Sequence, residues 1–228
     1  MLFAEVVAAS TVVAATRSRL AKVEALASAL RAAEEGEVPA VASFLVGRPT
    51  QGRLGTGWRT VVRLTVDPAV EATLTVADVD TALGELAAVA GAGSAARRSA
   101  VLTELLGRAS AEEQEFLVRL LTGELRQGAL EGILVDAVAK AAGIGVEDVR
   151  RAVMLSGSLP ATASAARTGG VAALRAFRLV LWRPIRPMLA SPAASLDAAL
   201  GEFADVTVEY KLDGARIQVH RDGDDVHV

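Results

Sequence analysis

The sequence predicts a mainly α-helical protein of about ten helices, followed toward its end by a few short strands. Apolar residues make up 52% of the 228 residues but only 4% are aromatic, a composition that favours closely packed helices. Thr75 with Asp78, and Ser110 with Glu113, have the spacing of capping boxes at helix starts. Apolar and polar residues alternate at 206–210 and 216–220, which is typical of strands. Because the helices precede the strands, we expect two segregated units rather than a β-α-β fold.

The first half of the chain is predicted to consist of helices separated by glycine, proline and capping residues. Gly47 and Pro49 close one of them, and the glycines at 52, 55 and 57 lack the spacing of a nucleotide-binding fingerprint. The expected helices are 2–14, a second from Thr16 or Ser18 to about 33, 38–46, a short helix or extended piece at 59–64, 75–90, 95–108 and 111–122.

The second half continues with helices and then changes character. Gly169-Gly170 should break one helix, and two prolines make 182–190 an extended linker. A turn at Asp222-Gly223-Asp224 should lead into a last strand. The expected helices are 130–142, 146–155, 158–166, 171–181 and 195–203. This predicts a helical domain at 1–181, a linker at 182–194 and a small β-rich piece at 195–228.

Composition excludes several classes of site. The chain has no cysteine, so it has no disulfide and no thiolate metal site, which fits a reducing compartment. No stretch resembles a membrane span, and the apolar N-terminus carries Glu5 without a basic region, unlike a signal peptide. We therefore expect a cytoplasmic protein with no membrane partner, and nothing in the sequence requires more than a monomer.

Positive charge is concentrated in one region. The whole chain has a net charge of −3, but residues 149–186 contain seven arginines and no acidic residue. Such a local field suits a polyanion, and Arg150 and Arg151 are the first candidates for binding it. The alternative is that these arginines are scattered over several helix faces.

A glycine-flanked arginine precedes the predicted helix 130–142. Gly123, Arg126 and Gly128 lie where free backbone N–H groups and the helix dipole favour a phosphate, and Arg126 could reach a minor groove. The alternative is a helix-to-helix corner whose arginine pairs with Glu124 or Glu131.

The segment 209–216 places a lysine at the end of a predicted strand. Desolvation and neighbouring cations would lower the pKa of Lys211 and make it a nucleophile, while Asp213-Gly214 provides a turn. Arg216 could clamp a phosphate or ribose. The alternative is a hairpin corner with a solvated lysine.

Three segments together carry a family resemblance. Glu209-x-Lys211-x-Asp-Gly-x-Arg216 resembles motif I of the covalent nucleotidyltransferases, which comprise DNA ligases, RNA ligases and mRNA-capping enzymes. Arg-Pro-Met-Leu-Ala at 186–190 resembles the segment that leads into the adenylation domain of DNA ligases, and 123–128 is similar to their "GxLRxG" segment. The combination resembles ATP-dependent DNA ligases that have an N-terminal all-helical DNA-binding domain.

The resemblance implies a function for the intact enzyme. Lys211 would be adenylylated by ATP with Mg²⁺, with Glu209 on the adenine side and Arg216 on the ribose or phosphate. The AMP would then pass to the 5′-phosphate of nicked double-stranded DNA, which the 3′-hydroxyl seals, in replication, repair or recombination. Residues 195–228 would be the truncated start of the nucleotidyltransferase domain, without metal ligands, so we expect this chain alone to be catalytically incomplete. The alternative is a non-catalytic helical module that binds DNA or protein.

Overall fold

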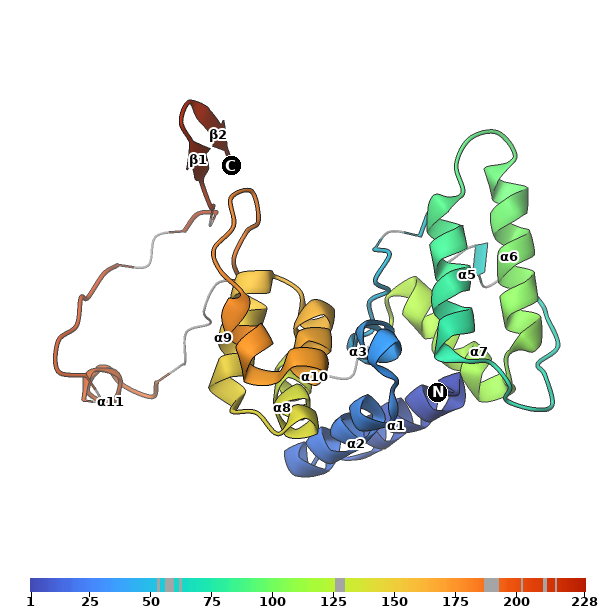
Figure 1. The fold of residues 1–228 in the computed structure, drawn as a ribbon, viewed down its shortest axis with the longest axis horizontal. Coiled ribbons are helices and arrows are strands. Elements are labelled where there is room, and N and C mark those ends of the chain that lie inside the picture. The colour runs from blue at the N-terminus through green and yellow to red at the C-terminus, as the bar shows by residue number, and fades with distance from the viewer. Residues whose placement is uncertain are drawn as a thin grey trace.

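The computed structural model shows a row of packed helices from which the last part of the chain extends (Figure 1). It describes residues 1–52, 54–55, 60–61, 63–125, 130–186, 193–201, 203–210, 213–215 and 217–228. In the part described, no helix is long and apolar enough to cross a membrane.

The helical part runs to residue 176 and contains nearly every element that the sequence predicts. The helices are α1 (Phe3–Ala15), α2 (Arg19–Ala32), the 3₁₀ turn η1 (Glu35–Glu37), α3 (Val38–Val46), α5 (Val76–Ala88), α6 (Ser94–Arg108), α7 (Ala111–Thr122), α8 (Leu130–Ala142), α9 (Val146–Ser156) and α10 (Leu159–Ala176). The predicted helix or extended piece at 59–64 falls partly outside the described residues.

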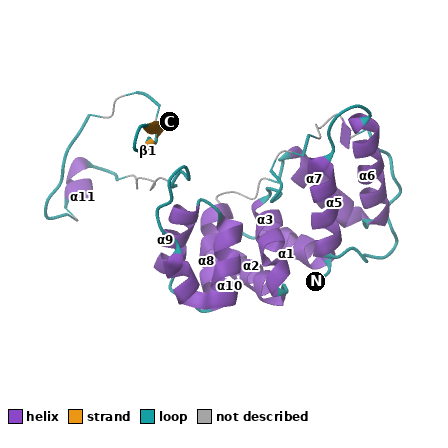
Figure 2. Ribbon diagram, turned by 45° about the horizontal axis from the view of Figure 1, so that its top comes forward, coloured by secondary structure: helices purple, strands orange, loops and turns teal. Residues whose placement is uncertain are grey.

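The helices form two groups joined through α1, α2 and α3. Both views show α5, α6 and α7 at one end of the row and α8, α9 and α10 at the other (Figures 1 and 2). The helix α2 packs against α8, and α10 packs against α3 and α9. At the opposite end, α1 contacts α7 and α3 contacts α5. The early helices therefore tie both groups into one body.

Aromatic rings mark the centre of the core, where α1 meets the other helices. The Phe3 ring lies edge-on to Phe44 of α3 and to Phe116 of α7, with centroid distances of 5.7 and 5.5 Å. Phe3 and Phe44 are completely buried. Buried aliphatic side chains continue the same cluster through both groups of helices. The apolar N-terminal stretch is thus a core helix.

Three predicted caps are confirmed by hydrogen bonds. The hydroxyls of Ser18, Thr75 and Ser110 accept the backbone N–H groups of residues 21, 78 and 113. Glu113 is fully buried, and its carboxylate accepts the backbone N–H of Ser110 at 2.8 Å. The buried face of α7 consists of Glu113, Phe116, Leu117 and Leu120.

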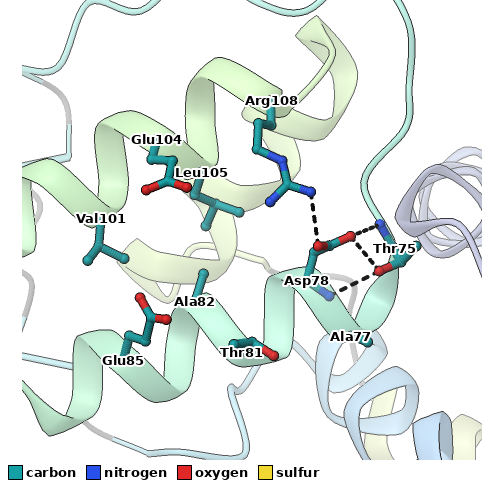
Figure 3. A pocket seen from close by; sticks show the side chains of 10 residues that line it. All are labelled: Thr75, Ala77, Asp78, Thr81, Ala82, Glu85, Val101, Glu104, Leu105 and Arg108. Atoms are coloured by element: carbon teal, nitrogen blue, oxygen red, sulfur yellow. Dashed lines mark hydrogen bonds and ion pairs between the residues drawn. The ribbon is translucent and has the colours of Figure 1, made fainter.

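The cap of α5 forms one end of a small hollow between α5 and α6 (Figure 3). Asp78 accepts hydrogen bonds from the hydroxyl and backbone N–H of Thr75, and from Arg108 at 2.9 Å. These bonds lower the pKa of Asp78 to about 2, those from Thr75 contributing most. Glu85 and Glu104 also line this hollow. Its negative charge disfavours a polyanion, and its polar groups are explained by capping.

The helix α10 differs from its prediction in length. Gly170 interrupts the helix with φ 58° and ψ −149°, as Gly169-Gly170 predicted. The second segment ends at Ala176 rather than 181, where Phe177 takes an extended conformation and donates its N–H to the Leu174 carbonyl. The exposed apolar residues that follow continue as a loop.

The strand predictions are confirmed only at the last hairpin. The strands β1 (His220–Asp222) and β2 (Asp225–His227) pair antiparallel around the predicted turn, and α11 (Leu196–Leu200) is shorter than expected. The predicted strand at 206–210 was wrong: these residues are irregular, and Val208 and Tyr210 are 69% and 96% exposed. Of the predicted strand at 216–220, only His220 is in a strand among the described residues. Alternating apolar and polar residues are typical of a half-buried strand. A strand also needs a neighbouring strand to bind its backbone N–H and C=O groups, and the alternation does not show whether one is present.

The hairpin end of the chain is attached to the loop after α10. The Gln218 side chain exchanges two hydrogen bonds with the backbone of Ile185, at 2.9 and 2.5 Å. The Trp182 ring lies 4.2 Å from that of His227, and its backbone N–H donates to Nδ1 of His220. The hairpin end therefore contacts residues 182–186 through hydrogen bonds and a ring contact.

Candidate nucleic-acid interface

The corner after α7 is held against the loop that follows α3. Gly123 ends α7 in the left-handed conformation, with φ 72°, and Leu125 is buried. Leu125 packs on Gly47, where an added Cβ would lie 3.0 Å from the Leu125 Cβ. Arg126 and Gly128, the other predicted DNA-binding residues of this corner, lie outside the described residues. The described start of this corner, Gly123 to Leu125, is thus held by a close glycine contact.

The loop after α3 has its own anchors. The backbone of Arg48 exchanges hydrogen bonds with Ser43, one to the Ser43 carbonyl and one from its hydroxyl. The Gln51 amide donates to the Asp80 carboxylate of α5 at 2.8 Å, and the Thr50 hydroxyl donates to the same carboxylate. These bonds hold the loop rigidly next to the corner.

The corner and the loop enclose a hollow of about 670 Å³. Its lining is mainly backbone, small side chains and leucines: residues 47–49, 52, 54, 55 and 120–123. Surfaces lined by glycine let another backbone approach closely. Another backbone can therefore approach this hollow closely, and Arg48 is the charged residue among those that line it.

A second hollow, of about 480 Å³, lies on the other side of Arg48. The start of α10, Glu131 of α8 and Arg186 of the linker also line it. Arg186 pairs with Glu131, and its Nε donates to the Gly157 carbonyl at 3.2 Å. Burial, and next the nearby Arg48 guanidinium, lower the pKa of Arg186. Two cations therefore face one carboxylate in this hollow.

The two arginines predicted from the basic region have different surroundings. Arg150 pairs with Glu147 one turn before it and with Asp136 of α8, and Asp136 also binds Arg19 at 2.6 Å. Arg151 is exposed and has no ion pair within the part of the chain that is described. Arg150 is thus largely neutralised by its own neighbours, whereas the charge of Arg151 faces solvent.

Of the remaining arginines at 149–186, some form ion pairs and others do not. Arg175 pairs with Asp148 at 3.2 Å and Arg186 with Glu131, while Arg167, Arg178 and Arg183 make no ion pair with the carboxylates described. The acid-free run in the sequence is therefore partly neutralised in space, by acids that precede residue 149.

Among the described residues, the neighbours of the predicted lysine are not arranged as a nucleotide pocket. Glu209 is exposed and irregular, as are Asp213 and Gly214, while Lys211 and Arg216 lie outside the described residues. Within the described ranges no group of three His, Cys, Asp or Glu residues could hold a metal ion. These described residues alone do not fit ATP or Mg²⁺, and no chemical step can be derived from them.

Sequence reasoning missed Arg48 and the link between Arg186 and Glu131. Gly47 and Pro49 indicated only the end of a helix, so the arginine between them received no role. The Arg186–Glu131 pair joins segments far apart in sequence, and no local pattern predicts such a contact. A glycine–arginine–proline sequence after a buried helix was the available signal for Arg48.

Two family models match separate parts of the chain. Residues 61–139 match the model described as "DNA ligase N terminus", and residues 187–228 match "ATP dependent DNA ligase domain". The first match covers the corner at 123–128, and the second covers the segment 209–216.

Curated relatives match the chain over its whole length. It is 60% identical to a "Probable DNA ligase" of Nocardia farcinica, 57% to one of Rhodococcus opacus and 52% to one of an Anaeromyxobacter species. Each alignment covers 100% of this chain but only 44%, 46% and 44% of the respective relative. The chain thus spans a little under half the length of these relatives.

Proposed function

Because the chain belongs to the ATP-dependent DNA ligase family, we propose that its helical part binds nicked duplex DNA for a nick-sealing enzyme. The helical part would grip the sugar–phosphate backbone and the minor groove without reading sequence. Residues 195–228 would contribute the lysine segment of the adenylation domain. We place the enzyme in replication, repair or recombination, acting in the cytoplasm as a monomer.

One observation carries the DNA-binding part of this proposal. The end of α7 with Gly123 and the loop that carries Arg48 form one glycine-lined hollow, so a cationic side chain lines a surface that a duplex backbone can approach closely. The net charge of −3 opposes indiscriminate binding, so a localised basic surface is needed. Gly123, Arg126, Gly128 and Arg151 remain the candidates for DNA binding, with Arg150 a weaker one because of its ion pairs.

The chemical part of the proposal rests on the family resemblance. Lys211 would be the nucleophile toward ATP, with Glu209 and Arg216 contacting the nucleotide, and carboxylates of the intact enzyme would hold Mg²⁺. More than half of each curated relative lies outside the matched region, which supports the expectation that further motifs complete the pocket. Phosphoryl transfer depends on metal and cationic groups around the phosphates, so the lysine alone supplies little rate.

A second function is favoured for the chain on its own. Tyr210 and Glu209 are exposed, and residues 206–210 form no strand, so the nucleophile's neighbours are not arranged as a site. We propose that this chain by itself acts as a DNA-binding module without catalysis.

The test is fluorescence anisotropy of a labelled nicked duplex at several salt concentrations. We expect affinity to fall steeply with salt, to fall further in Arg126→Ala, and to be unchanged in Lys211→Ala. An intact duplex and an unrelated nicked sequence serve as comparisons for nick and sequence preference. Absence of salt-sensitive binding in the wild-type chain would contradict the proposal.

A further inference from the structure

The hollow between α3, α10 and the linker joins two arginines from distant parts of the chain. Arg48 follows the C-cap of α3, and Arg186 ends the described part of the linker. The two guanidinium groups are close enough for Arg48 to lower the pKa of Arg186. Like charges are brought together in this way when a third group of opposite charge offsets their repulsion.

Arg186 is fixed in the hollow by three bonds. Its backbone N–H donates to the Met154 carbonyl at 3.1 Å, its Nε donates to the Gly157 carbonyl, and its Nη1 pairs with Glu131. Among the described residues its Nη2 has no hydrogen-bond partner. The guanidinium is therefore oriented, with one donor edge still available.

The backbone of Arg48 is fixed by hydrogen bonds, whereas its side chain is exposed and can bind a ligand. Ser43 binds its N–H and its carbonyl, while the side chain is exposed and meets no carboxylate at ion-pair distance in the described ranges. Glu131 is the only acidic residue that lines the hollow among those described, so Arg48 and Arg186 leave it with a net charge of +1. One additional negative charge would therefore neutralise the hollow.

The shape and the other lining groups suit a tetrahedral anion. The volume is about 480 Å³, and Ser158, the N-cap of α10, contributes a hydroxyl next to the positive end of that helix. Two guanidinium groups can bind phosphate oxygens through planar pairs of N–H donors, a geometry that lysine lacks. A carboxylate ligand would meet the same charges, but a phosphodiester is the anion that a DNA-binding surface encounters.

We propose that Arg48 and Arg186 together bind one phosphate group of the DNA backbone, and that this phosphate adds a further contact between the linker and the helical domain. The inference rests on the proposed DNA-binding function and adds a specific site to it. Glu131 holds Arg186 in place before DNA arrives and shares it with the phosphate afterwards. Since Arg186 begins the segment that leads to Lys211, DNA bound here would orient that segment relative to the duplex.

A double-mutant cycle tests whether the two arginines share one phosphate. Arg48→Gln, Arg186→Gln and the double variant are titrated with nicked duplex at several salt concentrations. Each single variant should lower the log–log salt slope by about 1 and weaken binding about three- to tenfold, as expected for one lost phosphate contact. The double variant should bind only slightly more weakly than either single variant, because residues with one shared partner are not additive. Arg31→Gln, which removes the same charge from α2 outside the hollow, is the matched control and should leave the slope nearly unchanged.

Two further variants separate phosphate binding from folding and from general charge. Arg186→Lys keeps the charge but loses the planar donor pair, so it should retain most of the salt slope and lose part of the affinity. Glu131→Gln removes the competing carboxylate and should tighten DNA binding about two- to fivefold, whereas a merely structural pair would weaken it. Circular dichroism and thermal unfolding establish that each variant remains folded.

The outcomes distinguish this site from the proposed function. Wild-type binding with unchanged slopes in both single variants would overturn the site and leave DNA binding intact. No binding by the wild-type chain would overturn both. Pyrophosphate binding is measured separately at fixed ionic strength: binding that is lost in Arg48→Gln and Arg186→Gln, while both variants bind duplex as the wild type does, would assign the site to a free polyphosphate instead. Additive effects in the double variant would mean two separate contacts rather than one shared phosphate.

Discussion

At the scale of single residues, Asp78 shows how a capping carboxylate acquires an unusual proton affinity. Its pKa is about 2 instead of 3.8, mainly through the bonds from Thr75 and then through Arg108. The folded chain therefore holds the ionised form more strongly than the unfolded chain does. This stabilisation is nearly complete above about pH 5, where the unfolded chain has lost the proton, and is lost as the pH falls toward 2.

Replacing this cap should make stability less sensitive to acid. Thr75→Ala should lower the free energy of unfolding by about 1 kcal/mol near neutral pH, the usual cost of losing an N-cap. The difference from wild type should shrink as the pH falls from 4 to 2, which denaturant unfolding at each pH would measure. Asp67→Asn, an exposed carboxylate near the same helix, is the control and should change neither quantity. A difference that stayed constant with pH would contradict the role of Asp78.

Arg150 and Arg151 are adjacent, yet they should contribute unequally to DNA binding. Arg150 already binds two carboxylates, so a phosphate must compete with them, while Arg151 has no such partner in the described ranges. We expect Arg151→Ala to reduce the salt slope by up to about 1 and Arg150→Ala to change it less. Anisotropy titrations of the two variants side by side would show which substitution reduces the salt slope more. Equal losses would mean that DNA displaces the ion pairs of Arg150.

At the scale of elements, the kink of α10 depends on a backbone conformation that only glycine adopts easily. Gly170 has φ 58° and ψ −149°. Gly170→Ala should therefore cost roughly 1–3 kcal/mol of unfolding free energy. Gly84 lies inside α5 with open space where a Cβ would stand, so Gly84→Ala should stabilise the chain by about 0.5–1 kcal/mol. Thermal or denaturant unfolding would compare the two, and a neutral Gly170→Ala would show that the kink can straighten.

The hairpin end should separate from the linker when its main contact is removed. Gln218 binds both backbone groups of Ile185, and an isolated two-stranded hairpin is marginally stable. Gln218→Ala should expose residues 217–228 to limited proteolysis while α1–α10 remain protected. Asp213→Ala, outside this contact, should leave the cleavage pattern unchanged. Retained protection in Gln218→Ala would assign the attachment to Trp182 and His227.

The helices were predictable because their signals are local, and the remaining features were not. The ranges 38–46, 111–122 and 130–142 match α3, α7 and α8, since a glycine directly follows each of these helices and Ser110 caps α7. The strand at 206–210 failed because strand formation depends on a partner that alternation does not reveal. The role of Gly123, Arg150 and Arg151 in DNA binding was predicted from spacing and charge and stays a prediction. The neutralisation of Arg150 by Asp136, and the place of Arg48 beside Arg186, depend on packing between helices.

At the scale of the whole molecule, we expect binding and chemistry to be separable in this chain. With Mg²⁺ and labelled ATP, the chain should form at most a trace of adduct, because the described neighbours of Lys211 do not form a nucleotide pocket. DNA binding should be unaffected in the same preparation. Gel detection of covalently bound label, with Lys211→Ala as the blank, would measure this. A robust adduct that disappears in Lys211→Ala would contradict the expectation.

The position of Phe3 also affects how the protein is made. This ring contacts Phe116, and α2 binds α8 through Arg19 and Asp136, so the first helices pack on segments that are synthesised much later. At usual elongation rates, α1 would wait roughly ten seconds after leaving the ribosome before α7 emerges. During that time its apolar face has no native partner, so the nascent chain should be a substrate for chaperones that recognise short apolar segments.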